Sequence, residues 1–259
     1  MTKSILLALS LVSAPLLLVA AEPAAPSAAE AVSWQDLHAG NEVANLSSLQ
    51  RGARDFTNYC LGCHSMKYLR WSRMCTDLSI PSAECAANLI PADAKPADYM
   101  LTNLRGEDAV AWFGKEPPDL SLIARSRSVD YLYRLFKTFY VDPSRPTRTN
   151  NLALDGLAMP AVLSALEGVK VAVYRNVDDV VDGKPTVRKV FDHFTSVAPG
   201  QLNAEQYDAF VRDTVNFLDY AGEPAQVDRR NMGVWVVLFL LVFTAIAWLM
   251  KKEYWKEVH

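Results

Sequence analysis

The segment Cys60-Leu61-Gly62-Cys63-His64 constrains the fold of this 259-residue chain more than any other stretch. Cys-x-x-Cys-His is the attachment motif of c-type haem. The two thiols add to the two vinyl groups of the porphyrin, and the next residue then lies beneath the iron, where an imidazole nitrogen can bind it. We therefore expect one covalently held haem c, attached through Cys60 and Cys63, with His64 as an axial ligand.

Two other interpretations of this motif are a redox-active dithiol and half of a zinc site. A thioredoxin-like dithiol lies near a βαβ pattern, and none is visible in this sequence. A structural zinc site takes four protein ligands. The chain has only two more cysteines and three more histidines, and none of them forms a second ligand pair. The sequence favours haem.

Residues 1–21 have the pattern of a secretory signal peptide. A positively charged start is followed by an apolar core over residues 5–19 and by small residues suited to cleavage at 19–21. A first transmembrane helix is the alternative. Pro15 and the Pro/Ala-rich stretch 22–31, which has no stop-transfer pattern, favour cleavage. We expect the mature chain outside the cytoplasm, where haem is attached to such motifs and disulfides persist.

A second apolar segment, Met232 to Met250, has nineteen residues without a charge. As a helix it would span roughly 28 Å, close to the hydrocarbon thickness of a bilayer. Trp235 and Trp248 lie near its two ends, where aromatic belts are found in membrane helices. The sequence predicts a transmembrane anchor over residues 231–250, joined to the preceding helix by a short linker at 221–228.

The charges that flank this segment do not orient it, because arginines precede it and lysines follow it. The signal peptide decides the orientation. It places residues 22–230 outside the cytoplasm as the haem domain and residues 251–259 inside as a tail.

Apolar residues at spacings of three and four predict helices over residues 45–60, 130–140 and 203–220. The last of these opens on a capping box, Asn203 to Gln206. Gly52 in the first helix costs about 1 kcal/mol relative to alanine. A close approach of another backbone explains such a glycine, and a loop at this position is the alternative.

Alternating apolar residues at 169–174 and 187–191, with turn residues 182–185 between them, predict one small β-hairpin. We trust no other strand signal in the chain. Residues 142–151 look like a loop, and Pro96 within 91–104 is consistent with a helix start.

Cys75 and Cys85 are the two remaining cysteines. In an oxidising compartment their pairing would stabilise the fold by roughly 3 kcal/mol in the chain-entropy model. Free buried thiols are the alternative, and the sequence favours a structural disulfide.

An electron-transfer haem needs a second axial ligand, and a thioether sulfur raises the potential of the iron. Met66 and Met74 are too close to His64 in sequence to reach the opposite face of the haem. Met100 lies in the segment interpreted as helical, where an apolar residue is usually core. Met159 is the best candidate, because its loop has glycine and proline on either side.

The remaining methionines belong to the signal peptide or to the membrane helix. His38 and His193 are alternatives to Met159 as the second ligand. His259 would lie on the other side of the membrane.

Composition sets broad limits on function. The net charge of −3 gives no basic excess of the kind that nucleic-acid binding needs, so we expect no nucleic-acid partner. The acidic pairs Glu107-Asp108 and Asp178-Asp179 could attract a basic partner. Ordinary solvated loops are the alternative for both pairs.

Together these residues resemble the bacterial form of the cytochrome c1 family, the haem subunits of the cytochrome bc1 complex (quinol–cytochrome c reductase). The resemblance covers the chain from about Ser33 to its tail. It rests on Cys60–Met66, Pro117–Ser121 and Ala158–Pro160, and on Phe217-Leu218 with Gly222-Glu223-Pro224 and Arg230–Gly233, which lead into the apolar C-terminal segment. The haem motif alone is common to many cytochromes, whereas its combination with Pro-Pro-Asp-Leu-Ser and this approach to the anchor is specific.

The resemblance implies a mainly α protein: a cytochrome c-like haem domain with insertions, which include the small hairpin, and one C-terminal transmembrane helix. It implies that Cys60 and Cys63 hold the haem, that His64 and Met159 are its axial ligands, and that Arg127 lies near a haem propionate. A solvent-facing arginine is the alternative for Arg127. The resemblance implies that the insertions pack against partner subunits.

The implied function is a one-electron relay from the Rieske iron–sulfur protein to a soluble or tethered c-type cytochrome. Cytochrome b would oxidise the quinol in the same complex, which is a dimer in this family. The implied location is the bacterial inner membrane, with the haem domain on the periplasmic side. The alternatives are a stand-alone membrane-anchored cytochrome that serves an oxidase or peroxidase, and a dithiol or structural module without haem.

Overall fold

The computed structural model describes residues 33–181 and 184–257. The predicted signal peptide, the Pro/Ala-rich stretch after it, two residues of the predicted hairpin turn, and His259 lie outside these residues.

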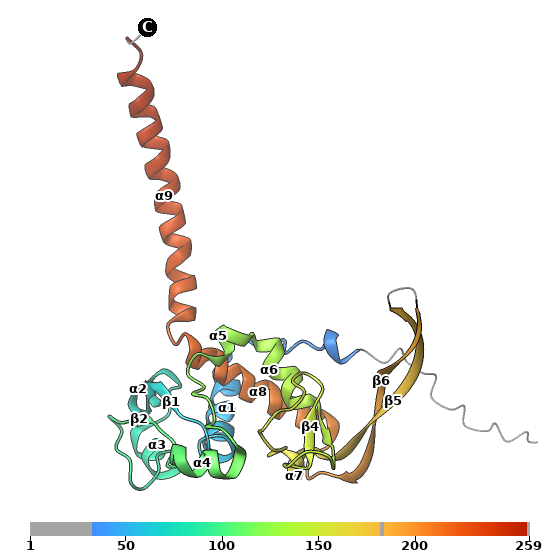
Figure 1. Ribbon diagram of the computed structural model, residues 1–259. Helices are drawn as coiled ribbons and strands as arrows, with labels where there is room; N and C mark the ends of the chain where they lie inside the picture. The colour runs from blue at the N-terminus through green and yellow to red at the C-terminus, as the bar shows by residue number, and fades with distance from the viewer. Residues whose placement is uncertain (1–32, 182–183, 258–259) are drawn as a thin grey trace, which may run out of the picture. The chain divides into compact units, whose positions relative to one another are not determined.

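The structure is mainly helical, as predicted, and has three antiparallel β-sheets of two strands each (Figure 1). The helices outside the membrane segment are η1 Trp34–Asp36, α1 Leu46–Tyr59, α2 Trp71–Asp77, α3 Ser82–Asn88, α4 Gly106–Phe113, α5 Ile123–Arg127, α6 Val129–Lys137, α7 Ser164–Glu167 and α8 Ala204–Gly222. The strands are β1 Met66–Arg70, β2 Tyr99–Met100, β3 Phe139–Val141, β4 Thr149–Asn151, β5 Gly168–Val181 and β6 Lys184–Pro199.

The core is built around α8, which packs against α1, α5 and α6 (Figure 1). Local sequence signals fix the starts of both long helices. Asn45 caps α1 by accepting the Ser48 amide, and Asn203 with Gln206 forms the predicted capping box of α8. The predictions of helices over residues 45–60 and 203–220 are therefore confirmed.

Gly52 marks the closest approach of α1 to α8. A Cβ atom at this position would lie 2.1 Å from the backbone oxygen of Asp213 and 2.7 Å from the Cβ of Phe217. The neighbouring Arg51 binds the carboxylate of Asp213 through two nitrogens. The expectation that another backbone lies against Gly52 is confirmed, and the loop alternative is wrong.

The predicted hairpin exists but is much longer than predicted, because β5 has 14 residues and β6 has 16. Much of this ribbon is exposed, so it does not need apolar alternation along its outer part. Cross-strand charge pairs stabilise this part instead; for example, Nε of Arg188 lies 3.1 Å from a carboxylate oxygen of Asp179. Period-two alternation therefore revealed the inner part of β5 and only the middle of β6, where residues 187–191 pair with residues 174–178.

Three sequence interpretations are wrong, two of them only in part. The stretch 91–104 contains strand β2, which pairs with β1, instead of a helix. The helix predicted over 130–140 ends at Lys137, and Phe139 to Val141 form β3. The side-chain amide of Asn151 donates a hydrogen bond to the Leu135 carbonyl at 2.7 Å. The predicted loop 142–151 contains strand β4, which pairs with β3.

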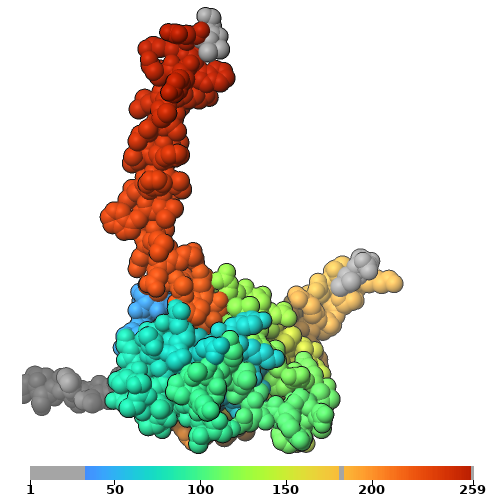
Figure 2. Space-filling model, turned by 90° about the vertical axis from the view of Figure 1, so that its left-hand side faces the viewer, coloured from blue at the N-terminus to red at the C-terminus, as the bar shows by residue number. Residues whose placement is uncertain are grey.

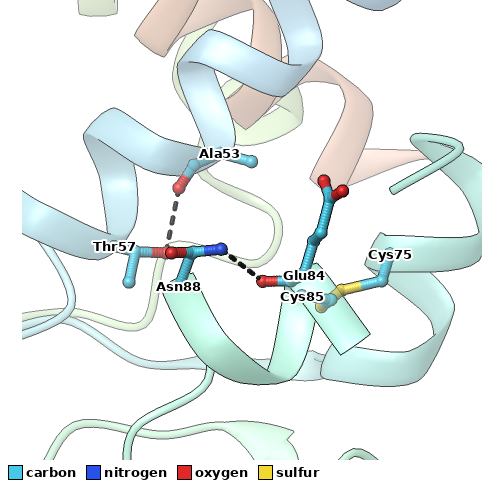
Figure 3. Close-up of a disulfide and its surroundings, with 6 residues drawn as sticks. All are labelled: Ala53, Thr57, Cys75, Glu84, Cys85 and Asn88. Carbon is cyan, nitrogen blue, oxygen red and sulfur yellow. Dashed lines mark hydrogen bonds between the residues drawn. A yellow bond between two sulfur atoms is a disulfide. The ribbon is translucent and has the colours of Figure 1, made fainter. Parts of the chain in front are cut away.

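Cys75 of α2 and Cys85 of α3 form a disulfide, as the sequence favoured (Figure 3). Their Cα atoms are 6.2 Å apart, and both residues are buried. The bridge joins two seven-residue helices that pack beside α1. Helices this short gain little from their own hydrogen bonds, so the covalent link contributes directly to their order.

The predicted apolar segment lies inside α9, Gln226–Tyr254. Within the described residues, α9 is the one helix long and apolar enough to cross a membrane, with a mean hydropathy of 2.5 over its most apolar window. None of that window is buried against the rest of the chain, and Figure 2 shows its side chains exposed. The non-helical link from α8 is only 223–225, shorter than the predicted linker.

Candidate haem site

The Cys60–His64 segment forms a tight turn directly after α1. Cys60 ends the helix and donates its amide to Phe56 at 2.8 Å. The amides of Cys63 and His64 then donate back to the Cys60 carbonyl at 3.0 and 2.8 Å. Both thiols are free, Cys60 is buried, and Cys63 and His64 are half-buried. The structure thus brings the three residues of the motif together.

A backbone carbonyl orients the imidazole of His64. Nδ1 lies 2.8 Å from the oxygen of Pro118, and a carbonyl only accepts, so Nδ1 carries the proton. Burial lowers the pKa of His64, although the Pro118 contact and Asp119 act in the opposite direction. A neutral imidazole is the form that binds a metal. Nε2 therefore keeps a lone pair for an axial bond.

The Pro117–Ser121 segment is held against the chain that follows the motif. Asp119 accepts the Lys67 amide at 2.8 Å through one oxygen and the Ser121 amide at 2.9 Å through the other. The hydroxyl of Ser121 accepts the Tyr68 amide at 3.1 Å. These bonds fix the position of the carbonyl that orients His64, which gives the Pro-Pro-Asp-Leu-Ser block a physical role.

Thr102 braces the motif from another segment. Its hydroxyl donates to the carbonyl of Gly62 at 2.9 Å, and its amide donates to the hydroxyl of Ser65 at 2.9 Å. The carbonyl of Ser65 in turn accepts the Leu120 amide at 2.9 Å. Sequence reasoning missed Thr102, since a contact to a backbone oxygen forty residues away leaves no pattern in the sequence.

The environment of Cys60 opposes a dithiol function. Burial, together with smaller contributions from Asp55 and Cys63, raises the pKa of this thiol to about 12. Reactive Cys-x-x-Cys pairs need the opposite shift, because the thiolate is the nucleophile. Within residues 33–181 and 184–257, no group of three or more His, Cys, Asp or Glu side chains is placed to hold a metal ion. The donor set fits a haem better than a dithiol or a zinc site.

Met159 lies in the loop between β4 and α7, half-buried against the same hydrophobic core that includes Cys60 and Leu61. Met66, Met74 and Met100, by contrast, are completely buried in that core. Neighbouring side chains enclose their thioethers, so these three methionines serve as core residues. Of the methionines described outside α9, Met159 alone keeps part of its side chain exposed.

The two histidine alternatives are engaged elsewhere. His38 is exposed and its Nδ1 lies 2.7 Å from Asp130, while the exposed His193 on β6 contacts Asp192 at 2.8 Å. Each of these contacts occupies only Nδ1, as in His64, so Met159 is favoured instead by its packing against the core that contains Cys60 and Leu61.

Arg127 ends α5 with an exposed side chain. Its guanidinium carbon lies 6.0 Å from the ring centre of Tyr131, and no carboxylate among the described residues pairs with it. The cation is therefore free to meet an anionic group that the chain itself does not supply.

A helical domain with this motif and a C-terminal apolar helix defines a membrane-anchored electron-transfer haem protein. A sequence model of the Cytochrome C1 family matches residues 41–258. The chain belongs to this family, whose members carry haem c and take part in electron transport.

Individual relatives agree with this assignment. Cytochrome c1 of Allochromatium vinosum is 44% identical over 218 residues, which cover 84% of this chain and 87% of that protein. The ammonia monooxygenase gamma subunit of Nitrosomonas europaea is 40% identical, with 83% and 86% covered. Cytochrome b/c1 of Bradyrhizobium diazoefficiens is 26% identical over 82% of this chain and 33% of that longer protein.

Proposed function

We propose that this chain is the haem c subunit of a quinol–cytochrome c reductase, the cytochrome bc1 complex. It receives single electrons from a Rieske iron–sulfur protein and passes them to a soluble or tethered c-type cytochrome. The main support is the Cys60–His64 turn with its imidazole oriented by Pro118, in a chain of the cytochrome c1 family.

Each site residue has a defined part in this proposal. Cys60 and Cys63 would form the thioether bonds, and His64 would offer Nε2 and Met159 its sulfur to the iron. Arg127 would pair with a haem propionate. When bound, the haem supplies an iron that changes by one electron. The chain keeps the ligands in place and burial around them sets the potential.

The proposed surroundings follow from the same family. The partners are cytochrome b and the Rieske protein, in a complex that is dimeric. The relative named cytochrome b/c1 joins the two names in one chain, which supports a cytochrome b partner. With the N-terminal signal removed, the haem domain lies on the periplasmic side of a bacterial inner membrane and α9 is its single span.

A stand-alone membrane cytochrome that donates to an oxidase or peroxidase is the second candidate. One relative is named as a subunit of ammonia monooxygenase and not of a cytochrome bc1 complex. Purification in mild detergent separates the two. Cytochrome b and a Rieske protein should copurify with this chain, and their absence would favour the second candidate.

The axial ligand is tested with Met159→Leu in the full chain. Leucine keeps the volume and removes the sulfur, so the midpoint potential should fall and the charge-transfer absorption of a methionine-bound ferric haem should disappear. Met100→Leu is the matched control, because Met100 is core. An unchanged potential in Met159→Leu contradicts the assignment, whereas a pyridine haemochrome spectrum without haem c contradicts the whole proposal.

A further inference from the structure

We propose that Asn150 and Asn151 are the positioning residues of the Met159 loop. This inference rests on the proposed role of Met159 as an axial ligand. The two asparagines end β4, immediately before the loop, and their side chains are only 3% and 1% exposed. Consecutive buried amides are costly unless their polar atoms are bonded, and here the bonds run both to the loop and to the fixed structure beside it.

Asn151 ties the start of the loop to the end of α6. Its Oδ1 accepts the amides of Ala153 and Leu154 at 2.9 and 3.2 Å, together with the hydroxyl of Thr138 at 3.1 Å. Its Nδ2 donates to the Leu135 carbonyl at 2.7 Å. A single side chain therefore connects two loop amides to a fixed helix terminus.

Asn150 ties down the middle of the loop. Its Oδ1 accepts the amide of Gly156 at 3.0 Å, where the chain turns with φ +74°. Its Nδ2 donates to Asp155 at 2.7 Å and to Asp142 at 3.1 Å. Arg145 also donates to Asp155 at 2.8 Å. We call Asn150 and Asn151 with these hydrogen bonds the asparagine frame.

The two side chains together bond the amides of three of the five residues from 152 to 156. Only Leu157 and Ala158 then separate the last bonded amide from Met159. A loop without regular structure would otherwise lose conformational entropy each time its methionine took a fixed position. The asparagine frame removes this cost in advance, so the sulfur is held where it can bind.

The test uses the full membrane-anchored chain with its haem, and four variants. Asn150→Ala and Asn151→Ala each remove the amide–loop bonds. Asn151→Asp keeps an acceptor oxygen for Ala153 and Leu154, but it replaces the donor to the Leu135 carbonyl with a second acceptor and adds a buried charge. Thr138→Val is the matched control, because it disturbs the same buried network and leaves both loop amides bonded.

Three readouts separate positioning from general stability. They are the charge-transfer absorption of the ferric haem, the midpoint potential, and hydrogen–deuterium exchange of residues 152–158. Both alanine variants should lose most of the absorption, lower the potential and speed exchange of the loop amides by at least tenfold. Asn151→Asp should recover most of the absorption, and Thr138→Val should match the wild type in all three readouts.

Normal absorption and potential in both alanine variants, while Met159→Leu loses them, would overturn the frame and leave the ligand assignment standing. An unchanged Met159→Leu variant would instead overturn the ligand itself. If Asn151→Ala does not accumulate, Asn150→Ala and Asn151→Asp decide between the same outcomes. Equal losses in Thr138→Val and the asparagine variants would also overturn the proposal, since general destabilisation would then explain them.

Discussion

Gly52 of α1 lies directly against the backbone carbonyl of Asp213 on α8, with no room for a side chain between them. The haem motif begins eight residues later, directly after the end of the same helix. The crossing of the two helices therefore determines where the Cys60–His64 turn lies relative to the rest of the core.

Gly52→Ala should destabilise the domain by about 3 kcal/mol or more, because the added methyl meets rigid backbone and overpacking cannot be relieved by a rotamer change. Urea unfolding followed by near-UV circular dichroism measures this loss. Gly233→Ala is the control, since a Cβ there meets no atom within 4 Å. Equal stability of the two variants would contradict the close helix crossing.

Replacing both Cys75 and Cys85 by serine should lower the free energy of unfolding by about 3 kcal/mol through loss of a short closed loop. Haem attachment should persist, because Cys60 and Cys63 are separate free thiols. Denaturation under oxidising conditions, with a haem stain on the unfolded chain, tests both statements. Loss of haem from this double variant would show that the bridge has more than a structural role.

Asp119→Ala should destabilise the domain by about 2 kcal/mol, because two amides lose a charged acceptor. The carbonyl of Pro118 would then hold His64 less firmly. Hydrogen bonding from Nδ1 raises the basicity of an imidazole ligand, which favours ferric iron, so the midpoint potential should rise. Potentiometric titration checks the direction. Asp119→Asn keeps one acceptor oxygen and should show a smaller shift in both quantities.

We expect the environment of the Asp208 carboxyl to make the free energy of unfolding fall in acid. Burial alone would raise its pKa, but hydrogen bonds from Tyr133, Arg212 and Lys137 lower the pKa to about 2. An aspartate in an unfolded chain titrates near pH ~3.9. A group with a depressed folded pKa stabilises the protein above its unfolded pKa, and this contribution is lost as pH falls through the folded value.

The difference in unfolding free energy between the wild type and Asp208→Asn should therefore be largest above about pH 5 and should shrink towards about pH 2. Urea titrations of both proteins at several pH values measure this difference directly, and the comparison cancels the other acidic groups. A difference that stays constant over this range would contradict the assigned hydrogen bonds.

Local signals in the sequence predicted the parts of the fold that local physics determines. Asn45 and Asn203 cap their helices through residues three positions away, so α1 and α8 could be placed within one or two residues. The ends that sequence misjudged depend on distant partners. For example, α6 ends where the carbonyl of Leu135 accepts a hydrogen bond from Asn151, a residue sixteen positions later in the chain.

The candidate site divides in the same way. The haem motif is contiguous, so Cys60, Cys63 and His64 could be identified without a structure. The supporting contacts are backbone atoms from remote segments, such as the carbonyl of Pro118, 54 residues from His64. Backbone acceptors have no side-chain identity for a sequence pattern to reveal. Thr102 and the asparagine pair emerged only from the folded arrangement.

The disulfide between α2 and α3 also determines which cysteines remain free to hold the haem. Four cysteines between residues 60 and 85 could join as two disulfides in three ways. Linking Cys75 to Cys85 rules out the two arrangements that would pair them with Cys60 and Cys63, and leaves the motif pair to the porphyrin. Losing one member of the bridge should thus harm maturation more than losing both, because a single orphan thiol becomes a competitor for its neighbours in an oxidising compartment.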